Sequence, residues 1–280
     1  MKTRVLLEGL AFPEGPRWRE GRLWLTDQHA HEVVTVDLQG RAERVVTGME
    51  DRPGGLGWLP DGTPLVVGMT RRRIHRIADG RLELHADLHD LASWHCNDMV
   101  VDDVGRAYVG NFGYDVDAGA PPRPAELILV EPNGQARVVS RDVVFPNGMG
   151  ITPDRRTLLV NETFAHRISA FRIEEDGSLS GHRLWADVGE ATPDGLCLDA
   201  EGAVWFACTT SGRLYRVLEG QAPSEPRTPR TPPYACMLGG PDRRTLFSVG
   251  AATHVPEEAA RLRSGTVEAF EVEVPGAGLP

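Results

Sequence analysis

The sequence lacks any long apolar run. The apolar segment within its first residues, MKTRVLLEGLAFPEG, is too short for a signal peptide. No stretch approaches the roughly 18 apolar residues that a membrane-spanning helix requires. These absences predict a cytoplasmic protein with no membrane partner.

Positive charge is also scarce relative to negative charge. The 280 residues include 30 Lys and Arg but 40 Asp and Glu, so the formal net charge is −10 at pH 7. This excess of negative charge argues against nucleic acid or an anionic membrane surface as the main partner. We therefore expect a small-molecule partner, and a monomer or a simple homo-oligomer as the assembly state.

Several chemical motifs are missing. None of the four cysteines, Cys96, Cys197, Cys208 and Cys236, lies in a CxxC or another zinc-like spacing. We expect buried, reduced thiols and no structural disulfide. The sequence contains no Gly-x-Ser-x-Gly motif, so it does not support a serine hydrolase. No GxGxxG motif follows a strand, which argues against a nucleotide cofactor.

Helix signals are nearly absent, and short β-rich segments separated by tight turns take their place. One helical stretch, PEEAARLRSG, lies near residue 260. A unit made of an apolar strand, a turn and a second strand occurs six times. The copies start 40–50 residues apart, at Glu14, Gly54, Asn97, Asn147, Asp194 and Cys236.

A repeat of about 40–50 residues holding about four strands has the size of a β-propeller blade. The sequence therefore predicts an all-β, six-bladed β-propeller with a central metal site, in a single domain over residues 1–280. We expect the N-terminal RVLLEGL to pair with GTVEAFEVEV and close the last blade, which removes an exposed edge. The alternative is a β-sandwich or barrel whose turns only resemble repeats.

The first residue of each copy is expected at one height in the central channel. Four of these residues, Glu14, Asn97, Asn147 and Asp194, carry side-chain oxygens. Oxygen ligands suit a hard divalent cation, so we predict one such ion, with Ca²⁺ preferred and Mn²⁺, Mg²⁺ or Zn²⁺ as alternatives.

Taken singly, these residues have simpler explanations. Asn147-Gly148 and Asp194-Gly195 are typical turn dipeptides. Equivalence in the repeat favours a shared site instead. Proline directly precedes Glu14, Gly54, Asn147 and Asp194, and its fixed φ would stiffen the approach of these positions to the channel.

Several segments resemble the regucalcin/gluconolactonase family, also called the senescence-marker-protein and luciferin-regenerating-enzyme family. The segments are FPEGPRW, NDMVVDDVGRAYVGNFG, FPNGMGITPD and TPDGLCLDAEG. The resemblance implies a six-bladed propeller with one catalytic divalent metal and hydrolysis of lactones, typically of sugar acids. The family's Glu, Asn and Asp ligands fall on Glu14, Asn147 and Asp194, and its additional amide falls on Asn97. Animal sugar-lactonase members carry an arginine two residues before that amide, whereas this chain has His95.

We therefore predict a metal-dependent lactonase in which water attacks the lactone carbonyl. Asp194 and His95 are both candidates for the general base. Substrate contacts are expected from Asn97, His95, Asn111 and Tyr114. Related propellers hydrolyse organophosphates, so a phosphotriesterase-like hydrolase is one alternative. A calcium-binding propeller without catalysis is the other.

Overall fold

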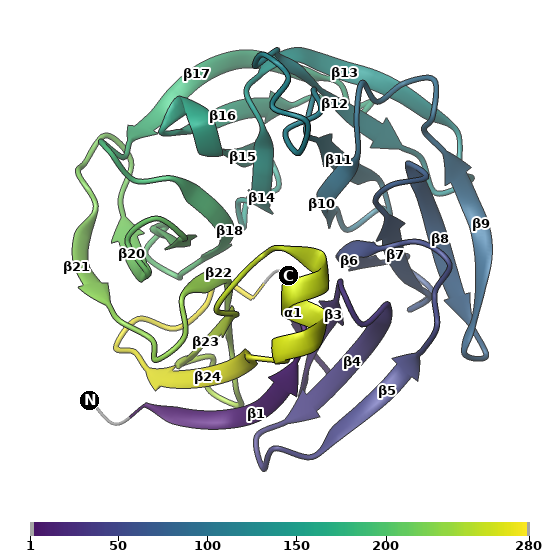
Figure 1. The fold of residues 1–280 in the computed structure, drawn as a ribbon. Coiled ribbons are helices and arrows are strands. Elements are labelled where there is room, and N and C mark those ends of the chain that lie inside the picture. The colour runs from purple at the N-terminus through teal and green to yellow at the C-terminus, as the bar shows by residue number, and fades with distance from the viewer. Residues whose placement is uncertain (1–2, 279–280) are drawn as a thin grey trace.

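The chain forms a ring of six four-stranded antiparallel sheets, a six-bladed β-propeller (Figure 1). The structure is a computed structural model that describes residues 3–278. This confirms the fold predicted from the repeats. We number the blades by the order of their innermost strands along the chain.

The first three blades follow one another without crossing. Blade 1 contains β2 (Pro13–Arg19), β3 (Arg22–Asp27), β4 (Glu32–Asp37) and β5 (Ala42–Val46). Blade 2 contains β6 (Pro53–Trp58), β7 (Pro64–Gly68), β8 (Arg73–Ala78) and β9 (Arg81–Asp87). Blade 3 contains β10 (Cys96–Val101), β11 (Ala107–Asn111), β12 (Ala125–Val130) and β13 (Ala136–Val143).

The next two blades repeat the same order. Blade 4 contains β14 (Pro146–Ile151), β15 (Thr157–Glu162), the short helix η1 (Thr163–Ala165), β16 (Arg167–Ile173) and β17 (Leu179–Asp187). Blade 5 contains β18 (Pro193–Leu198), β19 (Val204–Cys208), β20 (Arg213–Val217) and β21 (Ser224–Arg227).

Blade 6 is built from both ends of the chain. It contains β22 (Pro233–Gly239), β23 (Thr245–Gly250) and β24 (Gly265–Glu271), and its outermost strand is β1 (Arg4–Leu10). β1 pairs antiparallel with β24, with Arg4 opposite Ala269 and Leu10 opposite Gly265. This is the pairing expected from the sequence, and it covers the edge of β24.

The connection between β23 and β24 carries α1 (Pro256–Leu262), the helix expected near residue 260. Figure 1 shows α1 beside the central channel, and Ala259 on this helix packs against Phe12, which precedes β2. The connection therefore covers part of the channel mouth. None of the helices in residues 3–278 is both long and apolar enough to span a membrane.

The six innermost strands lie next to one another around the channel, and β22 returns to β2. β6 and β18 are buried along their whole length because sheets pack on both of their faces. Glycine allows the inner strands to come close. A Cβ on Gly148 of β14 would lie 2.5 Å from the Leu196 nitrogen and 2.6 Å from the Asp194 carbonyl oxygen of β18.

Between the sheets, apolar side chains of neighbouring blades form shared cores. Leu65 and Val67 of blade 2, for example, belong to the same buried cluster as Met99 and Val109 of blade 3. All four cysteines are buried and free. Burial of these apolar layers holds adjacent blades together and fixes the positions of the inner strands.

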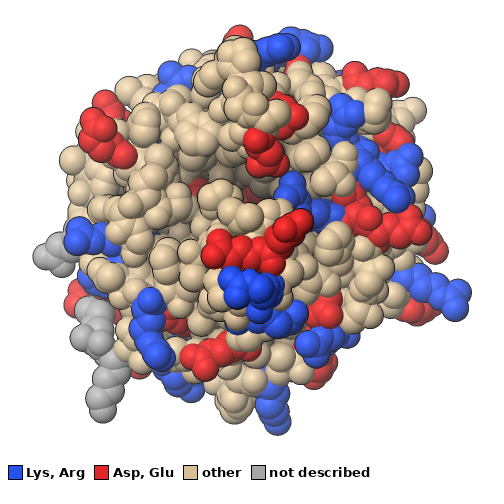
Figure 2. Space-filling model, viewed as in Figure 1, with Lys and Arg blue, Asp and Glu red and all other residues tan. Residues whose placement is uncertain are grey.

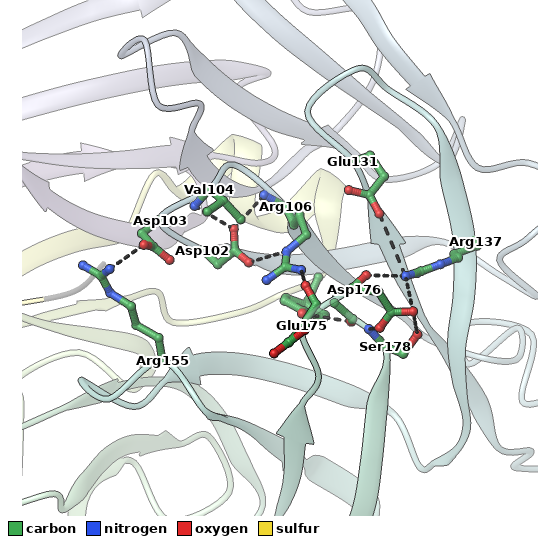
Figure 3. Close-up of polar contacts among 12 residues, drawn as sticks. Asp102, Asp103, Val104, Arg106, Glu131, Arg137, Arg155, Glu175, Asp176 and Ser178 are labelled. Carbon is green, nitrogen blue, oxygen red and sulfur yellow. Dashed lines mark hydrogen bonds and ion pairs between the residues drawn. The ribbon is translucent and has the colours of Figure 1, made fainter.

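The repeated Asp-rich turns form polar networks between neighbouring blades, shown for blades 3 and 4 in Figure 3. Asp102 Oδ1 accepts hydrogen bonds from the backbone nitrogens of Val104 and Arg106, and its Oδ2 lies 2.7 Å from Arg106 Nε. Arg106 then donates across to the Glu175 carbonyl oxygen of blade 4, at 2.8 Å. The aspartates of these turns therefore have a structural role: they hold the turns and position side chains that contact the next blade.

Candidate metal centre and active site

The strand pairing defines one ring of equivalent positions at the channel. In every blade, the residue just before this position pairs with the second strand: Pro13 with Asp27, Pro53 with Gly68, Cys96 with Asn111, Pro146 with Glu162, Pro193 with Cys208 and Pro233 with Gly250. The ring positions are therefore Glu14, Gly54, Asn97, Asn147, Asp194 and Tyr234.

The sixth position corrects the prediction from the sequence, which assigned it to Cys236. The predicted start lies two residues too late. One residue arises because β22 has seven residues, whereas the inner strands of blades 2–5 have six, and the other because Cys236 stands five residues before the Pro-Asp of its turn, whereas Asn147 stands six before its own. Cys236 is fully buried, with its Sγ 3.9 Å from the Sγ of Cys197. The proline signal identifies the correct residue, since Pro233 precedes Tyr234 as proline precedes four other ring positions.

Glu14 and Asp194 bring two carboxyl groups into electrostatic contact. Burial raises the pKa of Asp194 well above its ordinary value, and the charges of Glu14 and Asp98 raise it further. Burial raises the pKa of Glu14 to about 8, although a hydrogen bond from the Gly15 nitrogen opposes this shift. The protein alone therefore does not balance the negative charge of the two carboxylates, and a bound cation would stabilise both in their ionised form.

Asn147 lies beside this pair. Its Nδ2 is 3.3 Å from Thr163 Oγ1, and a hydrogen bond from its side chain lowers the pKa of Asp194. Both contacts use the amide as a donor, so the Asn147 oxygen is left as an acceptor. Thr163 Oγ1 in turn donates to the Pro193 carbonyl oxygen at 2.8 Å. Blade 4 thus positions the segment that carries Asp194.

Asn161 supports the same segment from β15. Its Nδ2 donates to the Asp194 carbonyl oxygen at 2.6 Å, while its Oδ1 is buried without a hydrogen-bond partner among the described residues. A buried polar atom without a partner is costly unless water or an ion satisfies it. This observation fits a site that holds solvent or a cation near Asp194.

Arg17 and Asp98 form a buried ion pair close to these carboxyl groups. Arg17 Nη2 lies 2.8 Å from Asp98 Oδ1 and 2.6 Å from the Met99 carbonyl oxygen. The pair joins blades 1 and 3 across blade 2, where Gly55 leaves room: a Cβ there would lie 2.2 Å from Asp98 Oδ1. Because Arg17 is engaged by Asp98, it only partly offsets the charge of Glu14.

Side-chain acceptors fix the loops that lead into the inner strands. Asp27 accepts from the nitrogens of Ala11 and Phe12 at 2.8 and 2.7 Å, just before Glu14. Glu162 accepts from the Val144 nitrogen at 2.7 Å, just before Asn147. Cys208 Sγ accepts from Thr192 at the same place in blade 5, whereas in blades 3 and 6 the acceptors lie on the third strand, Glu126 for Ser93 and Glu268 for Arg230 and Thr231. These contacts preorganise the ring positions.

Oxygen donors from two carboxylates and two amides fit a hard divalent cation such as Ca²⁺. Within residues 3–278, no three His, Cys, Asp or Glu side chains are grouped so that they could hold a metal ion. Any ion held here would therefore need the amide oxygens as well. Asn97 occupies the ring position of blade 3, and its side chain makes no hydrogen bond with the described protein atoms.

The structure places the other predicted site residues in different layers. His95 is half-buried at the channel mouth, where it stacks on Trp94 with the ring centroids 4.9 Å apart. Burial lowers the pKa of His95, and the charge of Arg52 lowers it further. His95 is therefore uncharged at neutral pH and able to accept a proton.

Asn111 and Tyr114 lie behind the mouth. Asn111 is fully buried, and its amide donates to the Glu126 carbonyl oxygen at 3.0 Å and accepts from the Gly113 nitrogen at 2.9 Å. Through these contacts Asn111 stabilises the loop around Trp94, whose nitrogen also donates to Asn111 Oδ1 at 3.4 Å. Tyr114 is only 7% exposed and packs edge-on against Phe145, with ring centroids 6.2 Å apart.

Aromatic rings from blades 3 and 4 line one side of the mouth. Phe112 stacks on Phe145 with centroids 4.6 Å apart, and Phe145 contacts Phe164 at the same separation. Phe164 is exposed. Figure 2 shows the mouth as a hollow near the centre of this face, with both acidic and basic side chains at its rim. The hollow combines an apolar wall with charged groups.

A family model described as the SMP-30/gluconolactonase/LRE-like region matches residues 12–252. The chain belongs to this family. The matched range holds all six ring positions, from Glu14 to Tyr234, so the family assignment covers the whole candidate site.

Two curated relatives illustrate the similarity. A 6-deoxy-6-sulfogluconolactonase from Pseudomonas putida is 30% identical over 190 residues, which cover 66% of this chain and 64% of that protein. Regucalcin from Danio rerio is 27% identical over 270 residues, covering 91% of this chain and 88% of that protein.

A solved structure shows the same architecture. It is a calcium-binding protein, regucalcin, from Agrobacterium tumefaciens, similar to this chain with a TM-score of 0.82 and 22% sequence identity. The match covers 100% of this chain and 96% of that one. At this level of identity the likeness establishes the six-bladed fold.

Proposed function

We propose that this protein is a hydrolase that opens the ring of a lactone, with one divalent cation held in the channel. The observation that supports the proposal is the ring of equivalent positions, to which Glu14, Asn147 and Asp194 belong, together with the effects of Glu14 and Asn147 on the pKa of Asp194. The family and the relative named 6-deoxy-6-sulfogluconolactonase support a lactone of a sugar acid or a related compound. We also propose that residues 1–280 act as one domain.

Glu14, Asn147 and Asp194 would hold the cation, with Asn97 as a fourth oxygen donor. Ca²⁺ is the preferred candidate, because the relatives include a regucalcin described as calcium-binding. Mn²⁺, Mg²⁺ and Zn²⁺ remain alternatives for such a donor set. When bound, the cation would neutralise the two carboxylates and polarise the lactone carbonyl.

The protein's own groups would handle the proton and the substrate. Either Asp194 or His95 would take the proton from the attacking water. His95 is uncharged but would have to release the contact of its Nδ1 with Arg52 Nη2 to accept this proton, whereas a carboxylate that binds a cation is a weaker base. Asn97 and His95 would contact the lactone from blade 3. The buried setting strengthens these polar interactions by excluding water.

The test is metal-dependent hydrolysis. Purified protein would be treated with a chelator, and acid release from a panel of aldonolactones and phosphotriesters would be followed with and without added Ca²⁺, Mn²⁺, Mg²⁺ or Zn²⁺. We expect one of these ions to restore lactone hydrolysis. Calcium binding without hydrolysis of any substrate would overturn the enzyme proposal, and turnover of phosphotriesters alone would favour the phosphotriesterase alternative.

The variant Asp194→Ala should abolish metal-dependent hydrolysis, with a loss of at least about 10²–10³-fold, as when a group that stabilises the transition state is removed. Glu190→Gln is a matched control, since Glu190 is an exposed acidic residue four positions away. Unchanged thermal unfolding would show that the fold survives. Full activity in Asp194→Ala would remove Asp194 from the mechanism.

A further inference from the structure

A second ring of equivalent positions lies two residues before the first ring. Its members are Phe12, Arg52, His95, Phe145, Thr192 and Pro232. Blades 1 and 4 contribute aromatic rings here, and blades 5 and 6 contribute small or apolar groups. Blades 2 and 3 differ, because they place a guanidinium and an imidazole side by side.

Arg52 and His95 meet across the boundary between these two blades. Arg52 Nη2 lies 3.4 Å from His95 Nδ1. Since the guanidinium can only donate, His95 Nδ1 acts as the acceptor in this contact. Arg52 also acts on His29, which follows β3 in blade 1. Burial lowers the pKa of His29, and the charge of Arg52 lowers this pKa further. Arg52 therefore lies between His29 of blade 1 and His95 of blade 3.

The guanidinium of Arg52 has no carboxylate partner within 4.0 Å among the described residues, and its Nε is buried without a hydrogen bond. Two arginines that hold the blades together do have such partners: Arg17 pairs with Asp98 at 2.8 Å, and Arg216 pairs with Asp199 at 2.7 Å. A half-buried guanidinium without such a partner is costly unless a ligand supplies the anion.

The nearest acidic residues do not take that role. Both carboxylate oxygens of Asp51 are engaged, since they accept from the backbone nitrogens of Arg52, Thr70 and Arg71 at 2.8–3.0 Å. Asp117 is exposed and acts on Arg52 only at longer range. The donors of Arg52 thus stay available at the mouth.

Charge balance points in the same direction. A divalent cation would neutralise Glu14 and Asp194, while Arg17 neutralises Asp98. The charges of Asp117 and Asp51 act on Arg52 without an ion pair, so its guanidinium donors are left for a negatively charged group on the bound molecule.

We propose that Arg52, together with His95, forms an anion subsite that recognises a carboxylate, sulfonate or phosphate carried by the lactone substrate. This inference rests on the proposed lactone hydrolysis and specifies its substrate class. Blade 2 thereby supplies the cationic contact, whereas the animal sugar lactonases supply an arginine at the position of His95. The ring carbonyl would lie toward Glu14 and Asp194, and the anionic substituent toward blades 2 and 3.

The test compares two lactones that differ in one group. D-Glucaro-1,4-lactone carries a carboxylate where D-glucono-1,4-lactone carries a hydroxymethyl group. We expect the wild-type protein to prefer the anionic lactone in kcat/KM by about 10–100-fold, the range for hydrogen bonds to a charged group. Arg52→Gln should remove this preference mainly by raising KM for the anionic lactone, so that the loss on the anionic lactone exceeds the loss on the neutral one by about 10-fold or more.

Two further variants separate recognition from structure. Arg52→Lys keeps the charge but not the planar fork, so it should retain part of the preference. Arg71→Gln is the matched control, because Arg71 is an exposed arginine nearby that pairs with Glu50 at 2.7 Å. It should keep the wild-type preference. Equal losses on both lactones in Arg52→Gln, or a wild-type preference for the neutral lactone, would overturn the proposal.

Binding measurements distinguish this inference from the proposed function. Calorimetric titration of the Ca²⁺-loaded protein with D-glucarate and D-gluconate compares a dianion with its singly charged homologue without any turnover. Tighter binding of D-glucarate that Arg52→Gln abolishes would support the anion subsite even if no lactone is hydrolysed. Equal binding of the two would refute the subsite even if lactonase activity is present.

Discussion

At the scale of single residues, Tyr234 is the main addition that the structure makes to the candidate site. It occupies the ring position of blade 6, next to the carboxyl groups of Asp194 and Glu14. Burial raises the pKa of Tyr234 to about 12, and the charges of Asp194 and Glu14 also raise it. The phenol therefore stays protonated at neutral pH and can donate a hydrogen bond to a carboxylate, to water or to the substrate.

Removing that donor should slow turnover. We expect Tyr234→Phe to lower kcat by about ten-fold, the effect of losing one hydrogen bond of about 1.4 kcal/mol in the transition state. The measurement is steady-state kinetics on the best lactone. Tyr215→Phe serves as the control, since Tyr215 stacks on Phe206 within blade 5. An unchanged kcat in Tyr234→Phe would show that the hydroxyl takes no part in the reaction.

At the scale of structural elements, the loops before the inner strands connect stability with the site. Glu162 is fully buried at the end of β15, where it accepts from the Val144 nitrogen at 2.7 Å and from Arg167 Nε at 2.8 Å. A neutral amide can accept only part of this set and loses the ion pair. The loop that precedes Asn147 would then be less well fixed.

We expect Glu162→Gln to lower the free energy of unfolding by about 1.5–3 kcal/mol, because a hydrogen-bonded buried charge is lost. It should also weaken Ca²⁺ binding through the displaced loop. Urea unfolding and calorimetric titration measure the two effects. Glu174→Gln is a control in the same blade, because Glu174 lies at a surface turn and should change stability by less than about 0.5 kcal/mol. Equal stability of the two variants would contradict this role of Glu162.

At the scale of the whole molecule, ring closure depends on β1. Every other outermost strand follows its neighbour through a short connection, whereas β1 comes from the opposite end of the chain and joins blade 6 by pairing with β24. If β1 detaches, β24 becomes an unpaired edge. Detachment of β1 would therefore expose the backbone donors and acceptors of β24, which could then pair with another molecule.

Proline on β1 tests this point. Glu8→Pro places a residue without an N–H opposite Thr266, and we expect release of β1, faster proteolysis near the N-terminus and concentration-dependent association in light scattering. Glu83→Pro is the matched control, because Glu83 is also an exposed glutamate on an outermost strand, opposite Arg76 of β8. Its strand stays tethered through the turn, so association should not increase. Equal association of both variants would contradict the closure mechanism.

The sequence by itself determined the repeat, and with it the fold. Each copy buries one sheet face against the next blade, so strand pattern and turn residues recur with a fixed period and can be read locally. The same equivalence singled out Glu14, Asn147 and Asp194 as candidates, because positions in a repeat can be compared between copies without knowledge of distant contacts.

Only the tertiary structure decided which side chains face one another. Tyr234 was missed because β22 is one residue longer than the inner strands of blades 2–5 and the sixth copy was started one residue too close to its turn, a shift of two positions that the pairing with β23 corrects. The contact of Arg52 with His95 joins residues 43 positions apart, and Arg17 reaches Asp98 over 81 positions, through space opened by Gly55. Asn111, a polar loop residue in sequence terms, lies fully buried under the mouth. Such contacts depend on how whole blades pack, and side-chain packing between segments distant in sequence leaves no local pattern.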